Sequence, residues 1–237
     1  MGKRSRMLIG TLKPFTMELF EEIKSQIKDY REKGLTLFTS SSFQTHSTVL
    51  LHIISRIDKN IPVYFLNTGF HFPETLLYRN NISELFGLNT VSLISSTPKI
   101  RQVDEHGRFL FTSDPDYCCY LNKIQPLEPM LDFFDVWING VRADQNENRA
   151  TFNTEEKTNH HAFRYHPMLK WTNKMIYDYI REFNIPKHPL DEKGYLSIGC
   201  EPCTRKISME LMLDERQARW YGMNKTECGL NTELVKK

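Results

Sequence analysis

The chain has 237 residues, which is enough for one α/β domain with a substantial hydrophobic core. Its 40% hydrophobic and 25% charged residues are typical of a soluble globular protein, and its 31 basic and 29 acidic side chains nearly cancel. This balance gives no support to nucleic-acid binding, and no apolar run approaches the ~20 residues of a membrane-spanning helix. The basic N-terminus lacks the apolar run of a secretory signal, so we expect a cytoplasmic protein.

The first 94 residues alternate predicted helices and strands. Apolar residues at helical spacing predict a helix over 16–33, which Gly34 ends. Strands are predicted over 35–39, 61–66 and 90–94, a helix over 49–57, and another helix that begins at Pro73. Strand, loop and helix repeated in this order favour a parallel sheet with crossover helices.

Polar loops follow the first two predicted strands. The first is the serine-rich loop 40–47, and the second contains Asn67, Thr68 and Gly69. Parallel sheets bind ligands at the carboxyl ends of their strands, and a helix N-terminus offers N–H groups to an anion. The serine-rich loop lacks the Gly-Lys-Ser/Thr ending of a P-loop, which argues against a Walker-type nucleotide site.

The second half is predicted to contain fewer regular elements. A strand over 136–138 ends at Asn139 and Gly140, a polar loop runs from 141 to about 161, and a helix covers 173–183. A Gly- and Pro-containing loop then carries Cys200. We expect the residues after Cys228 to be poorly ordered.

Four of the five cysteines form two pairs, Cys118 with Cys119 and Cys200 with Cys203. In a reducing compartment such clusters bind metal or do chemistry more often than they form disulfides. Zinc ligand pairs usually have two to four intervening residues, whereas a [4Fe–4S] cluster offers separate irons to adjacent thiolates. The pattern favours a cluster, with zinc and unliganded thiols as the alternatives.

The fifth cysteine, Cys228, lies near Lys225 and is a candidate nucleophile, because a nearby cation raises its thiolate fraction. The alternative is that Cys228 is a surface cysteine without a function. Arg216 and Arg219 are three residues apart, so on a helix they would share a face and could bind one anion. Five histidines lack a ligand pattern and are interpreted as surface or loop residues: His46, His52, His71, His160 and His161.

Several segments, in this order, resemble the adenylylsulfate/phosphoadenylylsulfate reductases of assimilatory sulfate reduction, of the type with a [4Fe–4S] cluster. They are Asn67 to Gly69 with Pro73 to Thr75, Cys118-Cys119 with Lys123, Gly140 with Arg142, Asp144, Gln145 and Arg149, Gly194-Tyr195 with Cys200 to Arg205, Glu215-Arg216 with Arg219-Trp220, and Glu227-Cys228-Gly229-Leu230. Relatives usually have His where this chain has Asn231, and acidic residues that the loop 40–47 lacks.

The resemblance implies an α/β fold of the adenine-nucleotide α-hydrolase-like (PP-loop) type, with a mostly parallel twisted sheet flanked by helices and a mobile C-terminal tail. Residues 1–214 would form a single domain that carries the iron–sulfur site, and residues 215–237 a C-terminal segment with the catalytic Cys228. The implied ligands of a [4Fe–4S] cluster are Cys118, Cys119, Cys200 and Cys203.

The implied activity is thioredoxin-dependent reduction of adenylyl sulfate (APS), with its 3'-phosphorylated form (PAPS) as the other candidate substrate, to sulfite through a thiosulfonate on Cys228. Reduced thioredoxin or glutaredoxin would be the electron donor, in a homo-oligomer without nucleic-acid or membrane partners. The implied substrate-binding residues are Ser42, Leu66, Thr68, Gly69, Lys123, Gly140, Arg142, Arg149, Arg216 and Arg219.

Two other functions fit parts of the sequence. An ATP-dependent PP-loop enzyme, such as a sulfurtransferase or adenylyltransferase, needs a Ser-Gly-Gly-x-Asp-Ser type of loop, and residues 40–47 contain no glycine. A non-catalytic iron–sulfur or zinc nucleotide-binding protein would not need the Glu227-Cys228-Gly229-Leu230 motif.

Overall fold

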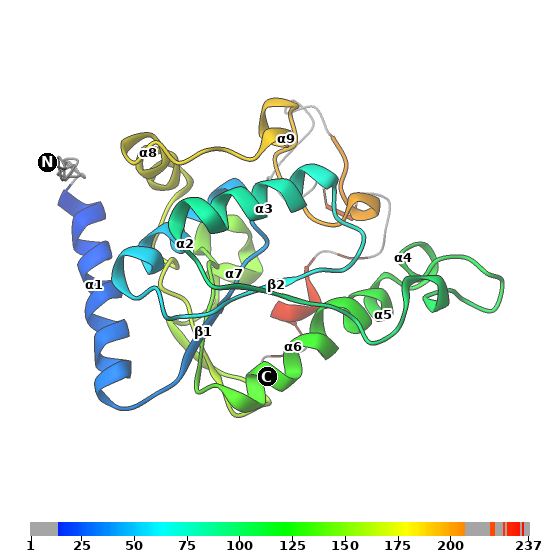
Figure 1. The fold of residues 1–237 in the computed structure, drawn as a ribbon, viewed down its shortest axis with the longest axis horizontal. Helices are drawn as coiled ribbons and strands as arrows, with labels where there is room; N and C mark the ends of the chain where they lie inside the picture. The colour runs from blue at the N-terminus through cyan, green and yellow to red at the C-terminus, as the bar shows by residue number, and fades with distance from the viewer. Residues whose placement is uncertain (1–13, 207–218, 221–224, 226, 233, 235–237) are drawn as a thin grey trace, which may run out of the picture.

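A six-stranded sheet in the order β3-β2-β1-β4-β6-β5 forms the centre of the molecule. The structure, a computed structural model, describes residues 14–206, 219–220, 225, 227–232 and 234 (Figure 1). Every neighbouring pair of strands is parallel except β5 and β6. The predicted, mostly parallel sheet is therefore confirmed.

The strands are β1 (Leu37–Ser40), β2 (Val63–Leu66), β3 (Thr90–Leu93), β4 (Val136–Ile138), β5 (Glu155–Lys157) and β6 (Phe163–Tyr165). The first four coincide with the predicted strands. The prediction of an uninterrupted polar loop over 141–161 is wrong, because this segment contains η3 (Ala143–Gln145), α7 (Glu147–Ala150) and β5. These elements and β6 have three or four residues each, which is too short to show hydrophobic periodicity.

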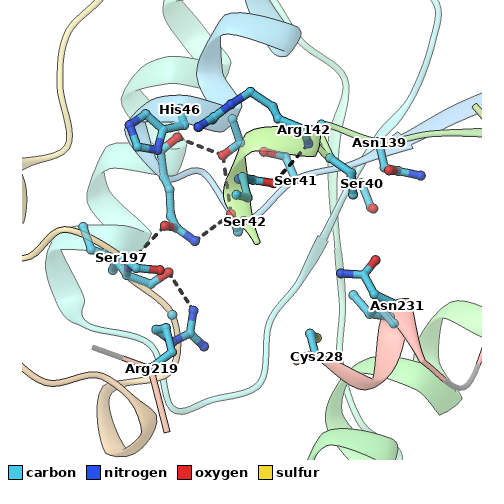
Figure 2. Close-up of a pocket in the computed structure, with 18 of the residues that line it drawn as sticks. Ser40, Ser41, Ser42, His46, Asn139, Arg142, Ser197, Arg219, Cys228 and Asn231 are labelled. Atoms are coloured by element: carbon cyan, nitrogen blue, oxygen red, sulfur yellow. Dashed lines mark hydrogen bonds between the residues drawn. The ribbon is translucent and has the colours of Figure 1, made fainter. Parts of the chain in front are cut away.

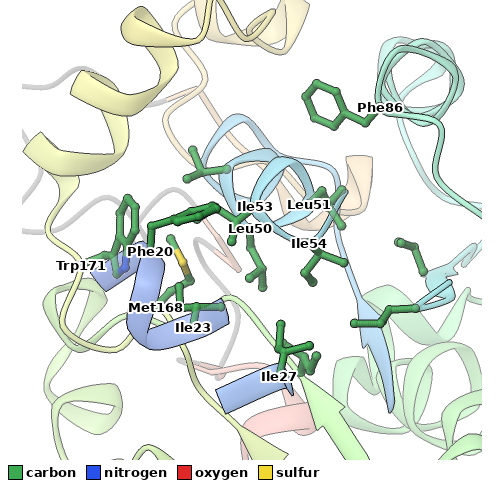
Figure 3. Packing of buried hydrophobic residues seen from close by; sticks show 14 of the residues in the cluster. Phe20, Ile23, Ile27, Leu50, Leu51, Ile53, Ile54, Phe86, Met168 and Trp171 are labelled. Carbon is green, nitrogen blue, oxygen red and sulfur yellow. The ribbon is translucent and has the colours of Figure 1, made fainter. Parts of the chain in front are cut away.

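One face of the sheet is covered by α1 (Pro14–Glu32), α2 (Thr45–Ile57), α3 (Pro73–Phe86) and α8 (Asn173–Glu182). Their apolar side chains form the larger hydrophobic cluster, in which Ile27 of α1 and Ile53 of α2 are at most 1% exposed (Figure 3). In α1 and α2, the stripe of apolar residues that predicted the helix is the face that is buried here.

The other face of the sheet is covered by α6 (Gln125–Phe133) and by the C-terminal tail (Figure 1). Leu127 and Leu131 of α6 pack with Phe38, Trp137 and the tail residue Leu234, which is 2% exposed. Gly229–Asn231 forms the short helix η6. Poor order after Cys228 stays a prediction; among the described tail residues, Leu234 packs in this apolar cluster.

The segment before α6 has an unusual helical geometry. Helix α5 (Pro115–Cys119) continues as a single π-helical turn, η2 (Tyr120–Ile124). Pro126 and Pro129 follow in α6 and have no N–H to donate, which disfavours a regular α-helical ladder at this junction. Such π turns recur at functional sites, and this one follows Cys119 and contains Lys123.

Four further helical segments complete the described chain: η1 (Lys99–Arg101), α4 (Leu110–Ser113), α9 (Pro189–Glu192) and η4 (Glu201–Cys203). None of the described helices has the length and apolar character needed to cross a membrane. The predicted boundary between residues 214 and 215 lies outside the described residues, so the division of the chain there stays a prediction.

Candidate active site

The carboxyl ends of β1, β2 and β4 meet at a cavity of about 410 Å³ (Figure 2). Ser40 at the end of β1, Leu66 at the end of β2, and Asn139 and Gly140 after β4 all line it. This is the edge at which open parallel sheets bind their ligands.

The serine-rich loop between β1 and α2 forms one wall of this cavity. Phe43 has a left-handed backbone (φ 52°), and its fully buried ring packs edge-to-face on Phe65 at 5.8 Å. Such a conformation is unfavourable for a bulky residue, so this core contact holds the loop in shape. Ser41 and Ser42 thereby line the cavity beside the N-terminus of α2, where free N–H groups favour an anion.

Gln44 connects this loop to the loop that carries Cys200. Its Nε2 donates to Ser42 Oγ at 3.4 Å, and its Oε1 accepts a hydrogen bond from the Ile198 N–H at 3.0 Å (Figure 2). Two segments 154 residues apart therefore share one wall.

The cavity is strongly cationic. Asp144 is the one carboxylate among its described lining residues, and Arg142 Nε donates to its Oδ1 at 2.9 Å. The cationic lining side chains are Lys123, Arg142, Arg149, Arg164 and Arg219. Excess positive charge in a partly enclosed site favours an anionic ligand.

Arg219 is held against the Cys200 loop by backbone carbonyls. Its Nη1 donates to Ile198 O at 3.2 Å and its Nε to Cys203 O at 3.4 Å, and the side chain is buried. Gly199 leaves the space for it, because a Cβ there would lie 2.1 Å from Arg219 Nη2.

A buried ion pair fixes the tail next to the cavity. Arg149 donates from Nε and Nη2 to the two Glu227 carboxylate oxygens, both at 3.0 Å, and the two side chains are at most 8% exposed. Asn146 Nδ2 donates to Glu227 Oε2 at 2.9 Å, and Cys228 N–H donates to Glu227 Oε1 at 2.8 Å. Arg149 was predicted as an anion contact, and the structure adds a carboxylate partner from the tail.

Arg164 and Asn139 line the cavity although the sequence interpretation did not single them out. Arg164 is fully buried, and its guanidinium lies 4.9 Å from the centre of the Trp137 ring. Burial lowers its pKa to about 10. Both amide atoms of Asn139 are buried without a hydrogen-bond partner among the described residues. The sequence feature that could have indicated Arg164 is a charged residue between two aromatic ones, Phe163-Arg164-Tyr165, after a long polar segment.

The interpretation of all five histidines as surface or loop residues is wrong for His46 and His52, which lie in α2, whereas His71 does lie in a loop. His52 contacts Tyr179 through Nδ1 at 2.9 Å from within α2, while His46 and His71 line the cavity and are half-buried. Burial lowers the pKa of His71 to about 4, so its ring is neutral at pH 7. Its Nε2 lies 2.9 Å from Leu66 O, an arrangement in which Nε2 carries the proton.

The four paired cysteines line a second, small cavity of about 10 Å³ next to the first. Thr68 Oγ1 lies 3.2 Å from Cys200 Sγ, and Asn122 Nδ2 donates to Cys118 Sγ at 3.6 Å. Among the described residues, no three Cys, His, Asp or Glu side chains converge as ligands of a single metal ion. Four sulfur donors around one cavity are a donor set that either an iron–sulfur cluster or a zinc ion can use.

The cysteine site needs positive charge to ionise. Burial, together with the nearby thiolates of Cys119, Cys200 and Cys203, raises the pKa of Cys118 to about 12. Burial alone would lower the pKa of Lys123, but the nearby thiolates of Cys228 and Cys119 raise it above its usual range. Lys123 lines both cavities and so connects the cysteine site to Cys228.

The structure brings most of the sequence-predicted site residues together. Cys228 and seven of the predicted substrate residues line the larger cavity: Ser42, Leu66, Lys123, Gly140, Arg142, Arg149 and Arg219. Thr68 lines the cysteine cavity instead, and Gly69 lines neither, since its carbonyl accepts a hydrogen bond from Lys99 Nζ. Arg216 lies outside the described residues.

Comparison with solved structures places the fold among α/β proteins of the PP-loop-like type. Phosphoadenylyl-sulfate (PAPS) reductase from Candida auris, solved as a phosphate complex, matches with a TM-score of 0.65, 18% identity, and coverage of 78% of this chain and 94% of that one. Candida glabrata FMN adenylyltransferase matches with a TM-score of 0.61, 15% identity, and coverage of 94% and 74%. The expected PP-loop-like α/β fold is therefore confirmed.

Sequence comparison is more specific. A protein named adenosine 5'-phosphosulfate reductase from Chelativorans sp. (strain BNC1) is 34% identical over 88% of this chain and 84% of its own length. Adenosine 5'-phosphosulfate reductase 2 of Bacillus subtilis (strain 168) is 34% identical over 93% and 94%. The model of the phosphoadenosine phosphosulfate reductase domain matches residues 36–206. With the parallel sheet, the cationic cavity and the paired cysteines in place, the chain belongs to the phosphoadenosine phosphosulfate reductase domain family.

Proposed function

We propose that this protein reduces a sulfonucleotide, adenylyl sulfate or its 3'-phosphorylated form, to sulfite, with Cys228 as the nucleophile. The observation that carries the proposal is that Cys228 lines the same cavity as Lys123 and four arginines. A thiolate that approaches a phosphosulfate is an anion that approaches an anion, so surrounding cations are required to stabilise the transition state.

In the first step, the Cys228 thiolate attacks the sulfur atom of the sulfuryl group. The new bond joins Cys228 Sγ to that sulfur, and the bond from sulfur to the bridging phosphate oxygen breaks. Its electron pair stays on the phosphate, so AMP (or its 3'-phosphorylated form) leaves and a thiosulfonate remains on Cys228. Lys123 and Arg219 would stabilise the charge that develops on the phosphate.

In the second step, a reduced thiol attacks Cys228 Sγ, and sulfite leaves with the electron pair of the S–S bond. The second thiol of the same donor then frees Cys228, so the donor is oxidised to a disulfide and supplies both electrons. We propose cytoplasmic thioredoxin or glutaredoxin as this donor. A homo-oligomeric state stays a prediction.

We also propose that Cys118, Cys119, Cys200 and Cys203 hold a [4Fe–4S] cluster. When bound, such a group supplies positive charge to the thiolates and a local electrostatic field. Thr68 and Asn122 would donate hydrogen bonds to its sulfur ligands. Lys123 would position the substrate anion between this site and Cys228.

Sulfite production tests the proposal. Anaerobically purified protein with reduced thioredoxin is expected to release sulfite from adenylyl sulfate or its 3'-phosphorylated form, and the ratio of the two kcat/KM values identifies the substrate. Cys228→Ser is expected to abolish release, because serine is a far weaker nucleophile at neutral pH. Sulfite release by Cys228→Ser at the wild-type rate would contradict the assignment.

The metal site has its own test. Iron and acid-labile sulfide analysis, with Mössbauer spectroscopy, is expected to find about four of each per chain. Cys118→Ser is expected to lose them, while the matched control Cys228→Ser keeps them because Cys228 lines the other cavity. One zinc per chain without sulfide would favour the zinc alternative.

A further inference from the structure

Arg164 has hydrogen-bonding capacity that its protein partners do not use. It lies in β6 and is fully buried. Its Cζ atom is 4.9 Å from the centre of the Trp137 ring and 5.5 Å from the centre of the Phe152 ring. Its Nη2 donates to Asn231 Oδ1 at 2.7 Å. Among the described residues, Nε and Nη1 have no partner. A buried N–H without a partner is unfavourable, so such groups usually face a ligand or an ordered water.

Arg164 lines the cavity together with the proposed nucleophile. Asn231 and Cys228 line it as well (Figure 2), and Asn231 ends the helix η6 that follows Cys228. Glu156 is paired with Arg164 in the register of β5 and β6, but no ion pair joins them in the described part of the chain. The charge of Arg164 is therefore available to a ligand at Cys228.

We propose that Arg164 binds the sulfonate group, first of the substrate and then of the thiosulfonate on Cys228, through a guanidinium N–H group that has no partner among the described residues. A hydrogen bond from a charged guanidinium to an oxyanion is roughly twice as strong as one between neutral groups. The aromatic rings fix the plane of the guanidinium, and the hydrogen bond to Asn231 holds Nη2 next to the Cys228 segment. The proposal deepens the proposed function and rests on Cys228 as the nucleophile.

The main competing role is purely structural. Arg164 could act through Asn231 alone and hold η6 in place. That role uses Nη2 and leaves Nε and Nη1 without a purpose. The two roles differ in what they predict for a ligand that has the nucleotide but no sulfonate.

Binding of AMP and of adenylyl sulfate separates the two roles. Calorimetry on the metal-loaded Cys228→Ser protein, which stops turnover, is to be compared with Cys228→Ser combined with Arg164→Gln. We expect adenylyl sulfate to bind about 10- to 100-fold more weakly, the usual effect of losing hydrogen bonds to a charged group, while AMP binding changes less than about twofold. If the affinities for AMP and for adenylyl sulfate fall by the same factor, or if neither affinity falls, the proposal is wrong.

Three variants complete the test in the protein that retains Cys228. Arg164→Lys keeps the charge but not the planar guanidinium and its N–H groups, so it is expected to slow thiosulfonate formation by a smaller factor than Arg164→Gln, and it serves if Arg164→Gln fails to fold. Asn231→Ala removes only the alignment and is expected to slow the step less than Arg164→Gln; an equal or larger defect would overturn the proposal. Arg79→Gln is the matched control, because Arg79 also rests on an aromatic ring, Phe65, but does not line the cavity.

The outcome can be separated from that of the proposed function. If the wild-type protein forms no sulfonate adduct on Cys228, the proposed function fails. If the wild-type protein forms it and Arg164→Gln forms it at the same rate, the proposed function stands and the role of Arg164 is overturned.

Discussion

The side chain of Arg219 leaves no room for a Cβ atom at Gly199. The backbone of Gly199 is not in the left-handed region, but a Cβ would lie between 2.1 and 2.4 Å from three guanidinium atoms of Arg219. The atoms in the way are the end of a flexible side chain, so the fold can tolerate a larger residue by moving them. Moving them would remove the Arg219 charge from its place beside Ile198.

We therefore predict that Gly199→Ala reduces activity more than stability. Loss of the Arg219 hydrogen bonds is expected to cost about 1 kcal/mol in the free energy of unfolding, and displacement of its charge to lower kcat/KM about 10- to 100-fold. Gly34→Ala is the control, since Gly34 has φ 75° with open space around its Cβ position and does not line the cavity. It should lower stability by about 1 kcal/mol with kcat/KM unchanged. Equal kcat/KM in Gly199→Ala and wild type would contradict this account.

The tail is held as an element by one buried carboxylate. Glu227 binds both Arg149 and the Cys228 N–H, and Asn231 Nδ2 donates to the same Oε1 at 3.3 Å. The thiol donor must reach Cys228 Sγ, yet the Cys228 side chain is half-buried. The stability of these Glu227 hydrogen bonds therefore determines how often the Cys228 thiol is accessible.

We predict that Glu227→Gln exposes Cys228. Removal of one charge of a buried pair leaves Arg149 uncompensated, which typically costs 3–5 kcal/mol where no relaxation occurs, as a rough upper figure. Part of this loss is expected to appear as opening of the tail, with alkylation of Cys228 by iodoacetamide at least ~10-fold faster, as read by mass spectrometry of the labelled peptide.

Exposed ion pairs provide the control for that prediction. Glu21→Gln breaks a pair with Lys24 in which both side chains are 54% exposed, and it should leave the alkylation rate unchanged. A Glu227→Gln protein whose Cys228 reacts at the wild-type rate would show that the ion pair does not hold the tail.

Elements with a clear apolar pattern could be predicted, and contacts between distant segments could not. The apolar residues of α1 and α2 repeat at helical spacing, and β4 is an unbroken apolar run, so their existence and type follow from the sequence. Arg149 was recognised as important, but its pairing with Glu227, 78 residues away, depends on the fold. Thr68 lies in the expected turn, yet its hydroxyl contacts Cys200 rather than lining the larger cavity. Arg164 was missed because its three-residue strand carries no pattern of its own.

At the scale of the whole molecule, buried neutral histidines link stability to pH. Burial lowers the pKa of His52 and His188 to about 4. Leu190 N–H donates to His188 Nδ1 at 3.1 Å, which requires an unprotonated nitrogen there. The unfolded histidines titrate near 6.5, so between pH 6.5 and about 4 the unfolded state binds more protons, and stability falls as the pH falls through this window. Above pH 6.5 these histidines do not change the free energy of unfolding as the pH changes.

We predict that the free energy of unfolding is lower at pH 5 than at pH 7. His188→Asn keeps an acceptor for the Leu190 N–H but cannot titrate, so its loss between pH 7 and pH 5 should be smaller by on the order of 1–2 kcal/mol. Urea unfolding at both pH values measures this difference. His106→Asn is the control, because the His106 side chain is 66% exposed, and its loss should equal that of the wild type. The same loss in His188→Asn as in the wild type would show that His188 is not the titrating group.

The central claim is that Cys228 attacks a sulfonucleotide held in the cationic cavity. Its most direct test is a single turnover, in which metal-loaded protein is mixed with sulfur-35-labelled adenylyl sulfate, or its 3'-phosphorylated form, without a thiol donor. The account predicts one labelled sulfonate on the peptide that contains Cys228, released as sulfite when reduced thioredoxin is added. Absence of label with both nucleotides, from protein whose metal site is intact, would contradict it.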